Sequence, residues 1–190
     1  MIETENLLLR GYTDEDVEEL FVILSDPVTM SFWPNPLTRE ETRAWIARSI
    51  ESFQDHGFGR YAVILKQDNR IIGDCGILRI EKAGELVNDL GYIIHHPYWR
   101  KGYAVEAARA VVDHAFDRLN LDVVHANMPH DHDSSRKVAE RIGMKRVGEF
   151  INERNGNVRT LLYAIGRVTS QQRGARYGND RNDLPSFQIQ

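Results

Sequence analysis

The sequence predicts a single α/β (α+β) domain built around a mostly antiparallel sheet. Two amphipathic helices come first along the chain, then three strands in succession, then a long helix. Strands that follow one another through short turns form an antiparallel meander. With 190 residues and 42% hydrophobic content, the chain is long enough for one sizeable core and short for two.

Two helices near the N-terminus are marked by capping residues and apolar stripes. After a short strand at 7–9, Thr13 can cap a first helix, and Thr38 opens a second helix with a capping box. In each helix the apolar residues recur at the spacing of one buried face. These stripes consist of Val17, Leu20, Phe21 and Leu24 in the first helix, and of Trp45, Ile46, Ile50 and Phe53 in the second.

The segment 31–36 between these helices is a candidate substrate loop. Its prolines, Pro34 and Pro36, exclude a helix, yet the segment carries the large aromatic residues Phe32 and Trp33. The two aromatics either cover a cleft and contact the substrate or cap the core beneath a loop, and the sequence favours neither alternative.

The rest of the chain predicts the meander, a long helix with a stripe of small residues, a short helix and a last hairpin. Gly143 supplies the left-handed residue that ends the short helix. A polar composition from Arg167 onward separates a domain at 1–166 from a tail at 167–190. The strands are expected at 61–65, 71–80, 87–94, 123–126, 146–150 and 158–165, the long helix at 103–119, and the short helix from Ser134.

Composition narrows the function classes. The formal net charge of −4 and the pI near 6.0 argue against a broad basic surface, so no direct nucleic-acid binding is expected. The lone cysteine, Cys75, excludes an internal disulfide and suits a reducing compartment. The acidic start of the chain is unlike a secretion signal, and the apolar segments are too short to span a bilayer. We therefore expect a cytoplasmic protein with no membrane partner.

The strand-to-helix turn around residues 99–104 is a candidate anion site. The first amides of a helix have no internal partners, and the helix dipole favours an anion beside them. Gly102 lets the backbone approach a ligand closely, and Arg100 and Lys101 add positive charge that favours a diphosphate. Neither of the common glycine-rich nucleotide motifs precedes a helix in this chain. Taken alone, the turn is a weak signal, and an ordinary strand-to-helix connection is the commoner explanation.

Three motifs in order resemble the GCN5-related N-acetyltransferases (GNAT), and within them the ribosomal-protein alanine acetyltransferase (RimJ/RimL-like) branch. The motifs are Asp89-Leu90-Gly91-Tyr92-Ile93-Ile94, Tyr98 to Ala107, and Ser135 to Met144. The resemblance covers most of residues 1–166. It implies a mixed, mostly antiparallel, twisted sheet of about six or seven strands, four main helices and a splayed central strand pair.

The resemblance also implies the co-substrate and the residues that bind it. Acetyl-CoA would enter between the splayed strands, and its pantetheine arm would pair with the backbone of Tyr92, Ile93 and Ile94. His132 stands where many relatives have an asparagine that contacts the cofactor, and a histidine can donate one hydrogen bond there. The pyrophosphate would lie on the amides of Arg100, Lys101, Gly102, Tyr103, Ala104 and Val105.

The reaction that the resemblance implies is direct attack of a primary amine on the thioester. A lysine amine is about 0.1% neutral near neutral pH, whereas an α-amine is roughly 20 to 30% neutral, so a protein N-terminus is the easier acceptor. Asp89 is the candidate base, although a solvated or ion-paired strand carboxylate is an equally good explanation. Ser135 is the candidate donor to the leaving thiolate, and helix capping is its alternative role. The amide of Ile94 would polarise the thioester carbonyl.

Other functions remain open at this stage. The histidine pairs at 95–96 and at 130 and 132, together with His125, lack a clear companion set of ligands, so no metal is predicted. A non-catalytic acyl-CoA-binding regulatory domain is one alternative. A ribosome- or RNA-associated module is another, carried by the tail residues Arg173, Arg176 and Arg181. The amine acceptor is not identified, and the chain is expected to be a monomer or a homodimer.

Overall fold

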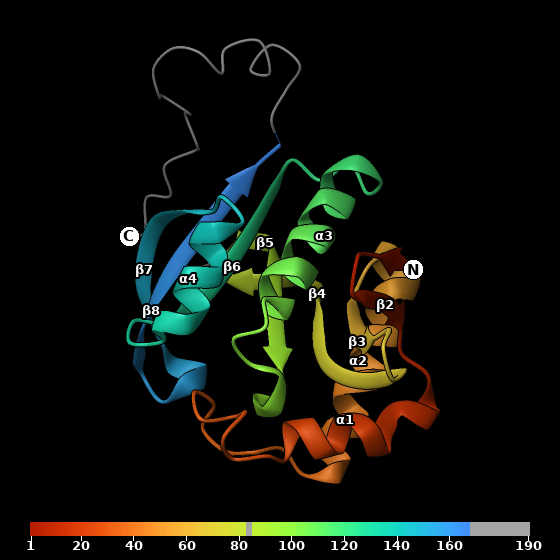
Figure 1. The fold of residues 1–190 in the computed structure, drawn as a ribbon. Coiled ribbons are helices and arrows are strands. Elements are labelled where there is room, and N and C mark those ends of the chain that lie inside the picture. Colours follow the sequence, from red (N-terminus) through yellow and green to blue (C-terminus); the bar gives the residue numbers. More distant parts are fainter. Residues whose placement is uncertain (83–84, 168–190) are drawn as a thin grey trace.

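A computed structural model describes residues 1–82 and 85–167 (Figure 1). Eight strands form one sheet in the order β1-β2-β3-β4-β5-β6-β8-β7, and all neighbours pair antiparallel except β5 and β6. The mixed, mostly antiparallel sheet is therefore confirmed. The strands are β1 (Ile2–Glu3), β2 (Leu7–Gly11), β3 (Arg60–Leu65), β4 (Arg70–Lys82), β5 (Glu85–Ile94), β6 (Val123–Pro129), β7 (Lys145–Asn152) and β8 (Val158–Gly166).

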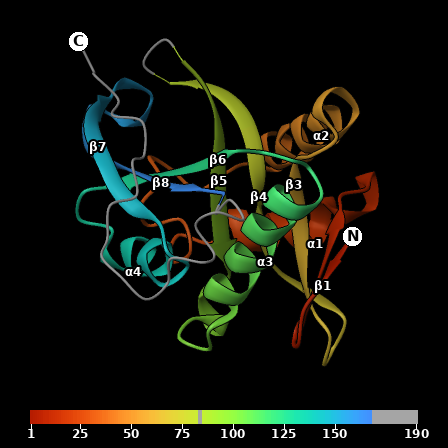
Figure 2. The same cartoon turned by 90° about the horizontal axis from the view of Figure 1, so that it is seen from above.

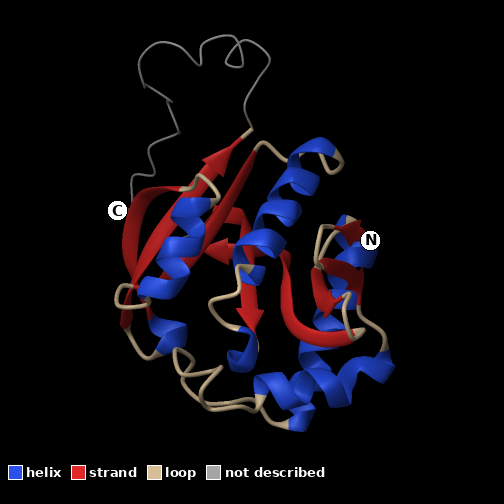
Figure 3. Cartoon of the chain, in the orientation of Figure 1, coloured by secondary structure: helices blue, strands red, loops and turns tan. Residues whose placement is uncertain are grey.

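Four α-helices cover the two faces of the sheet (Figure 3). One core joins the sheet to α3 and α4, and a second core joins the other face to α1 and α2. Figure 2 shows α2 and α3 on opposite sides of the strands. The helices are α1 (Val17–Leu24), α2 (Arg39–His56), α3 (Tyr103–Asp117) and α4 (Asp133–Arg141), with short 3-10 turns at Asp14–Asp16, His96–Tyr98 and Glu153–Asn155.

The predicted capping residues Thr38 and Gly143 are confirmed. Thr38 Oγ1 accepts the Glu41 amide at 3.2 Å, and the Thr38 amide donates to the Glu41 carboxylate at 2.7 Å, which completes the capping box of α2. Gly143, with φ +94°, takes the left-handed conformation expected after α4. Thr13 caps the 3-10 turn that leads into α1.

The structure also departs from the predicted boundaries. The sheet has eight strands because Ile2 and Glu3 pair with Leu9 and Leu8, a two-residue ladder too short to give a sequence pattern. Helix α3 ends at Asp117, before the predicted end at 119. Cys75 is fully buried in the core shared with α3.

The chain still contacts the fold at Arg167, whose amide donates to the Asp122 carbonyl at 2.8 Å. Residues 168–190, including Arg173, Arg176 and Arg181, lie outside the described residues. Within the described part of the chain, no helix is both long enough and apolar enough to cross a membrane.

Candidate active site

The two central strands part after a short parallel ladder. β5 and β6 pair only at Asp89 with His125 and at Leu90 with Ala126, although β5 continues to Ile94 and β6 to Pro129. One edge of β5 from Gly91 onward therefore has no neighbouring strand, while its other edge remains paired with β4. The splayed central pair expected from the sequence is present.

The open edge of β5 presents the backbone groups of Tyr92 and Ile94. The His95 amide donates to the Ile72 carbonyl at 2.8 Å, and antiparallel pairs alternate between hydrogen-bonded and non-bonded positions. Ile93, opposite Asp74, therefore directs its amide and carbonyl to β4, whereas Tyr92 and Ile94 direct theirs into the opening. The Ile94 carbonyl accepts a hydrogen bond from the Trp99 indole at 2.6 Å.

The turn between β5 and α3 ends in an uncapped helix N-terminus. Arg100 and Gly102 both have positive φ, +63° and +90°, and no side chain caps the helix at Gly102. The Glu106 amide donates to the Gly102 carbonyl at 3.0 Å, so the amides of the three preceding residues have no intrahelical acceptor. Those residues are Tyr103, Ala104 and Val105. The Lys101 ammonium lies over the Tyr98 ring, 5.3 Å from its centroid.

Glu106, the acidic residue in the first turn of α3, is held by the N-terminal hairpin. Its carboxylate accepts hydrogen bonds from the Thr4 hydroxyl at 2.6 Å and from the Asn6 amide at 2.8 Å. Burial raises the pKa of Glu106, but these hydrogen bonds outweigh it and leave the pKa below its ordinary value. The Glu106 carboxylate next to the turn is therefore held by hydrogen bonds from Thr4 and Asn6.

Ser135 contacts Tyr92 across the opening. The Tyr92 hydroxyl donates to the Ser135 carbonyl at 2.8 Å and lies 3.0 Å from the Ser135 hydroxyl, and either hydroxyl can donate in this second contact. Burial raises the pKa of the Tyr92 phenol well above its ordinary value, so the phenol stays protonated. Sequence reasoning assigned Tyr92 only a backbone role, because nothing in the sequence links two residues 43 positions apart.

Asp89 lies on the other face of β5. Side chains alternate along a strand, and Ile93 belongs to the core under α1 and α2, so Asp89 faces that side while Tyr92 faces α3 and α4. The two Asp89 carboxylate oxygens accept the Asn127 amide group of β6 at 2.9 and 3.0 Å. The two predicted catalytic residues therefore lie on opposite sides of β5, Ser135 with Tyr92 and Asp89 with Asn127.

A buried ion pair supports this face beneath β5. The Arg60 Nε donates to Asp74 at 2.6 Å, and the Arg60 and Asp74 side chains are only 7% and 0% exposed. Asp74 also accepts the Tyr12 hydroxyl at 2.7 Å and the Trp45 indole at 3.1 Å. Sequence reasoning missed this network, since Asp74 lies inside a predicted strand and Arg60 just outside one.

The loop between α1 and α2 reaches both walls of the opening. Phe32 stacks on His132, the residue before α4, with ring centroids 3.6 Å apart, and Trp33 packs edge-on against Trp45 at 5.7 Å. Phe32 and Trp33 remain 36% and 41% exposed. Burial lowers the pKa of His132 to about 4, so its ring is neutral near neutral pH. The loop thus joins the α2 side of the site to α4.

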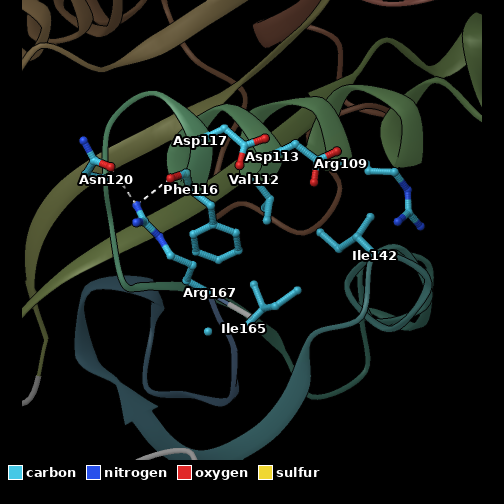
Figure 4. A pocket seen from close by; sticks show the side chains of 10 residues that line it. Arg109, Val112, Asp113, Phe116, Asp117, Asn120, Ile142, Ile165 and Arg167 are labelled. Carbon is cyan, nitrogen blue, oxygen red and sulfur yellow. Dashed lines mark hydrogen bonds between the residues drawn. The ribbon is translucent and has the colours of Figure 1, made fainter. Parts of the chain in front are cut away.

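A separate pocket of about 430 Å³ lies between α3 and the end of β8 (Figure 4). Arg167 crosses it and donates to the carbonyl of Phe116 and to the Asn120 side chain. The residues that line it are Arg109, Val112, Asp113, Phe116, Asp117, Asn120, Ile142, Ile165, Gly166 and Arg167. None of them belongs to the predicted site.

A mixed sheet that opens between two central strands, with an uncapped helix N-terminus beside the opening, is the architecture of acyltransferases that hold an acyl-CoA between the parted strands. Comparison with known proteins supports this class of protein. The model of the Acetyltransferase (GNAT) domain matches residues 6–145. The chain belongs to the GNAT acetyltransferase family, whose members use acetyl-CoA.

The relatives are similar over most of their length. An uncharacterized protein of Bacillus subtilis, YkkB, is 30% identical over 142 residues, which is 74% of this chain and 83% of that protein. The crystal structure of a GNAT-family acetyltransferase from Bacillus anthracis is 28% identical with a TM-score of 0.74, covering 87% and 97% of the two chains. RimL, a ribosomal L7/L12 α-N-protein acetyltransferase solved with coenzyme A, is 20% identical with a TM-score of 0.72, covering 86% and 95%.

Proposed function

We propose that this enzyme transfers the acetyl group of acetyl-CoA to a protein N-terminal α-amine, by direct attack of the amine on the thioester. The observation that carries the proposal is the juxtaposition of the open edge of β5 with the uncapped N-terminus of α3. One ligand that is both a hydrogen-bonding chain and a diphosphate satisfies both features.

In this proposal the pyrophosphate lies on the amides before and within the first turn of α3. The amides of Tyr103, Ala104 and Val105 point toward it, the turn is shaped by Gly102, and Arg100 and Lys101 supply positive charge. The pantetheine arm pairs with the backbone of Tyr92 and Ile94. Ile93 separates these two residues with its own backbone paired to β4, and His132 borders the arm from the side of α4.

The chemistry is divided between the two faces of β5. The amine nitrogen approaches from the side of Asp89, forms the C–N bond and loses a proton to the Asp89 carboxylate through water. The C–S bond breaks on the side of Tyr92, where the Ser135 hydroxyl, linked to the phenol, donates to the departing thiolate. The amide of Ile94 polarises the thioester carbonyl.

The acceptor side favours a small or terminal amine. Both oxygens of the Asp89 carboxylate already accept the Asn127 amide group, at 2.9 and 3.0 Å, so the site favours an amine that is largely neutral before it binds. An α-amine, roughly 20 to 30% neutral near neutral pH, tolerates this better than a lysine at about 0.1%. Phe32 and Trp33 would contact the residues that follow the acceptor amine.

The test is a continuous assay of free CoA thiol with acetyl-CoA and a panel of peptides and small amines. Peptides with a free N-terminus should react, and the same peptides blocked at the N-terminus but carrying lysine should not. Gly102→Glu places a carboxylate beside the pyrophosphate and should raise KM for acetyl-CoA at least tenfold. Gly156→Glu is the matched control, because Gly156 also has positive φ (+65°) and open space around it, but lies in the last hairpin.

Two results would reject the proposal. Equal effects of the Gly102 and Gly156 substitutions on KM for acetyl-CoA would show that the turn before α3 does not bind the pyrophosphate. Turnover with lysine side chains or polyamines but with no free N-terminus would leave the acetyl transfer in place and reject the α-amine as the acceptor.

A further inference from the structure

A cluster of two histidines and a carboxylate lies beside the candidate active site, and the proposed acetyl transfer does not use it. The ligand atoms offered by Asp26, His95 and His96 all lie within 4.8 Å of one another. Asp26 belongs to the loop after α1, and the two histidines directly follow β5. The histidine pair was visible in the sequence, but the carboxylate that completes the set comes from a distant segment.

Hydrogen bonds from the surrounding backbone fix the cluster in place. The Asp26 carboxylate accepts the Thr29 amide at 2.7 Å and contacts His96 Nδ1 at 2.8 Å. The Thr29 hydroxyl in turn accepts the His96 amide at 3.0 Å. The His95 amide donates to Ile72, which anchors the second ring to β4. The Asp26 ligand group is therefore oriented by an outer hydrogen bond, as is common in metal sites, while the two histidines are positioned through their backbone amides.

The two rings face a common space although their residues are adjacent. The chain turns from extended backbone at His95 into the 3-10 turn that begins at His96, and the ring centroids lie 5.3 Å apart. His95 and Asp26 are half-buried and His96 is exposed, so solvent can complete the coordination. Two imidazoles and one carboxylate with open positions are a ligand set that suits zinc and other divalent transition metals.

We propose that Asp26, His95 and His96 bind one divalent transition-metal ion, for which Zn²⁺ is the probe. His96 Nδ1 and the Asp26 carboxylate lie 2.8 Å apart, whereas two metal–ligand bonds of about 2.0 to 2.2 Å at a tetrahedral angle place their ligand atoms about 3.3 to 3.6 Å apart, so the two groups must separate by roughly 0.5 to 0.8 Å. Small rotations of the two side chains therefore admit an ion.

Such an ion would join the loop between α1 and α2 to the end of β5. Asp26 and Thr29 lead directly into the segment with Phe32 and Trp33, and His96 leads into the turn before α3. The bound metal would hold these two segments together from outside the opening. Its role would be to position the loop, and the proposal does not depend on which amine is acetylated.

The test is titration of the metal-free, untagged protein with Zn²⁺ by calorimetry and with Co²⁺ by visible absorption. Wild type should bind one equivalent, and Asp26→Asn and His95→Gln should each weaken binding at least tenfold. His56→Gln is the control, since His56 is an exposed histidine at the end of α2 and should leave binding unchanged. Far-UV circular dichroism checks that each variant is folded.

Thermal unfolding separates a metal site from a merely structural cluster. Zn²⁺ should raise the Tm of wild type and of the His56 variant, and should leave the Tm of the Asp26 and His95 variants unchanged. Asn at position 26 retains an oxygen that can accept the Thr29 amide, so this variant keeps the loop contact. The proposal is overturned if wild type binds neither metal, or if the Asp26 and His95 variants bind as tightly as wild type.

Discussion

Substitution of Gly91 by alanine tests how the buried Arg60–Asp74 pair supports the strand that lines the active site. A Cβ at position 91 would stand 1.8 Å from Arg60 Nη1 and 2.8 Å from its Cζ, so the methyl group and the guanidinium cannot occupy their places together. Nη1 shares one rigid guanidinium plane with Nε and Nη2, which bind the fully buried Asp74, so moving Nη1 out of the way strains both of these hydrogen bonds.

The cost follows from the separation of the pair. Removal of one partner from a buried ion pair typically costs about 3 to 5 kcal/mol, because the other charge stays buried without compensation. Unfolding free energies of single domains are about 5 to 15 kcal/mol, so Gly91→Ala should remove a large fraction of the stability. Gly11→Ala in β2 is the control, since a Cβ there meets nothing within 4 Å, and its effect should stay within about 1 kcal/mol.

The assay is urea unfolding followed by far-UV circular dichroism, with the midpoint and slope of each variant compared. A second cycle repeats Gly91→Ala in an Arg60→Ala background, where the space is already free. There the added cost should fall below about 1 kcal/mol, which gives a coupling energy of a few kcal/mol between the two positions. If Gly91→Ala is no more destabilising than Gly11→Ala, the guanidinium is not held where the structure has it.

Three further outcomes follow from the site. Ser135→Ala and Tyr92→Phe should each lower kcat about 10- to 100-fold with little change in KM for acetyl-CoA, and full activity of both would remove the hydroxyl pair from the mechanism. Phe32→Ala should raise KM for the acceptor several-fold more than KM for acetyl-CoA, and equal changes would contradict a substrate role for the loop. The pKa of His132 is lowered to about 4 from 6.5, so the unfolded chain binds this proton first, and stability falls as pH drops from 6.5 to 4. The loss of unfolding free energy has an upper limit of about 3 kcal/mol, and we expect roughly half of that because the His132 ring is only partly buried. The urea midpoints measured at pH 5 and pH 7 should therefore differ less in His132→Gln than in wild type.

Features that depend on residues close together in the sequence were predictable. The capping box at Thr38 and the left-handed Gly143 depend on contacts a few residues apart, and both were confirmed. The turn before α3 was also identified, because its glycine and basic residues are consecutive. The splay of β5 from β6 was expected from family resemblance alone, since the register of a parallel pair leaves no local pattern.

Features made by distant residues were not predictable. The contact of Tyr92 with Ser135 depends on the packing of α4 against β5. The position of Asp26 beside the histidine pair depends on the path of the loop after α1, so the sequence-based expectation of no metal ligand set overlooked the carboxylate. The contact of Asp89 with Asn127 is likewise set by the pairing of β5 with β6.

The hydrogen bond from the Trp99 indole to the Ile94 carbonyl affects which ligands fit the parted strands. Along the unpaired edge, two amides are free to donate, while one of the two carbonyls has already accepted a hydrogen bond from within the protein. The edge is therefore polarised toward donation. A ligand that carries oxygen acceptors, as amide and thioester groups do, fits this excess of donors better than a ligand that carries only N–H groups.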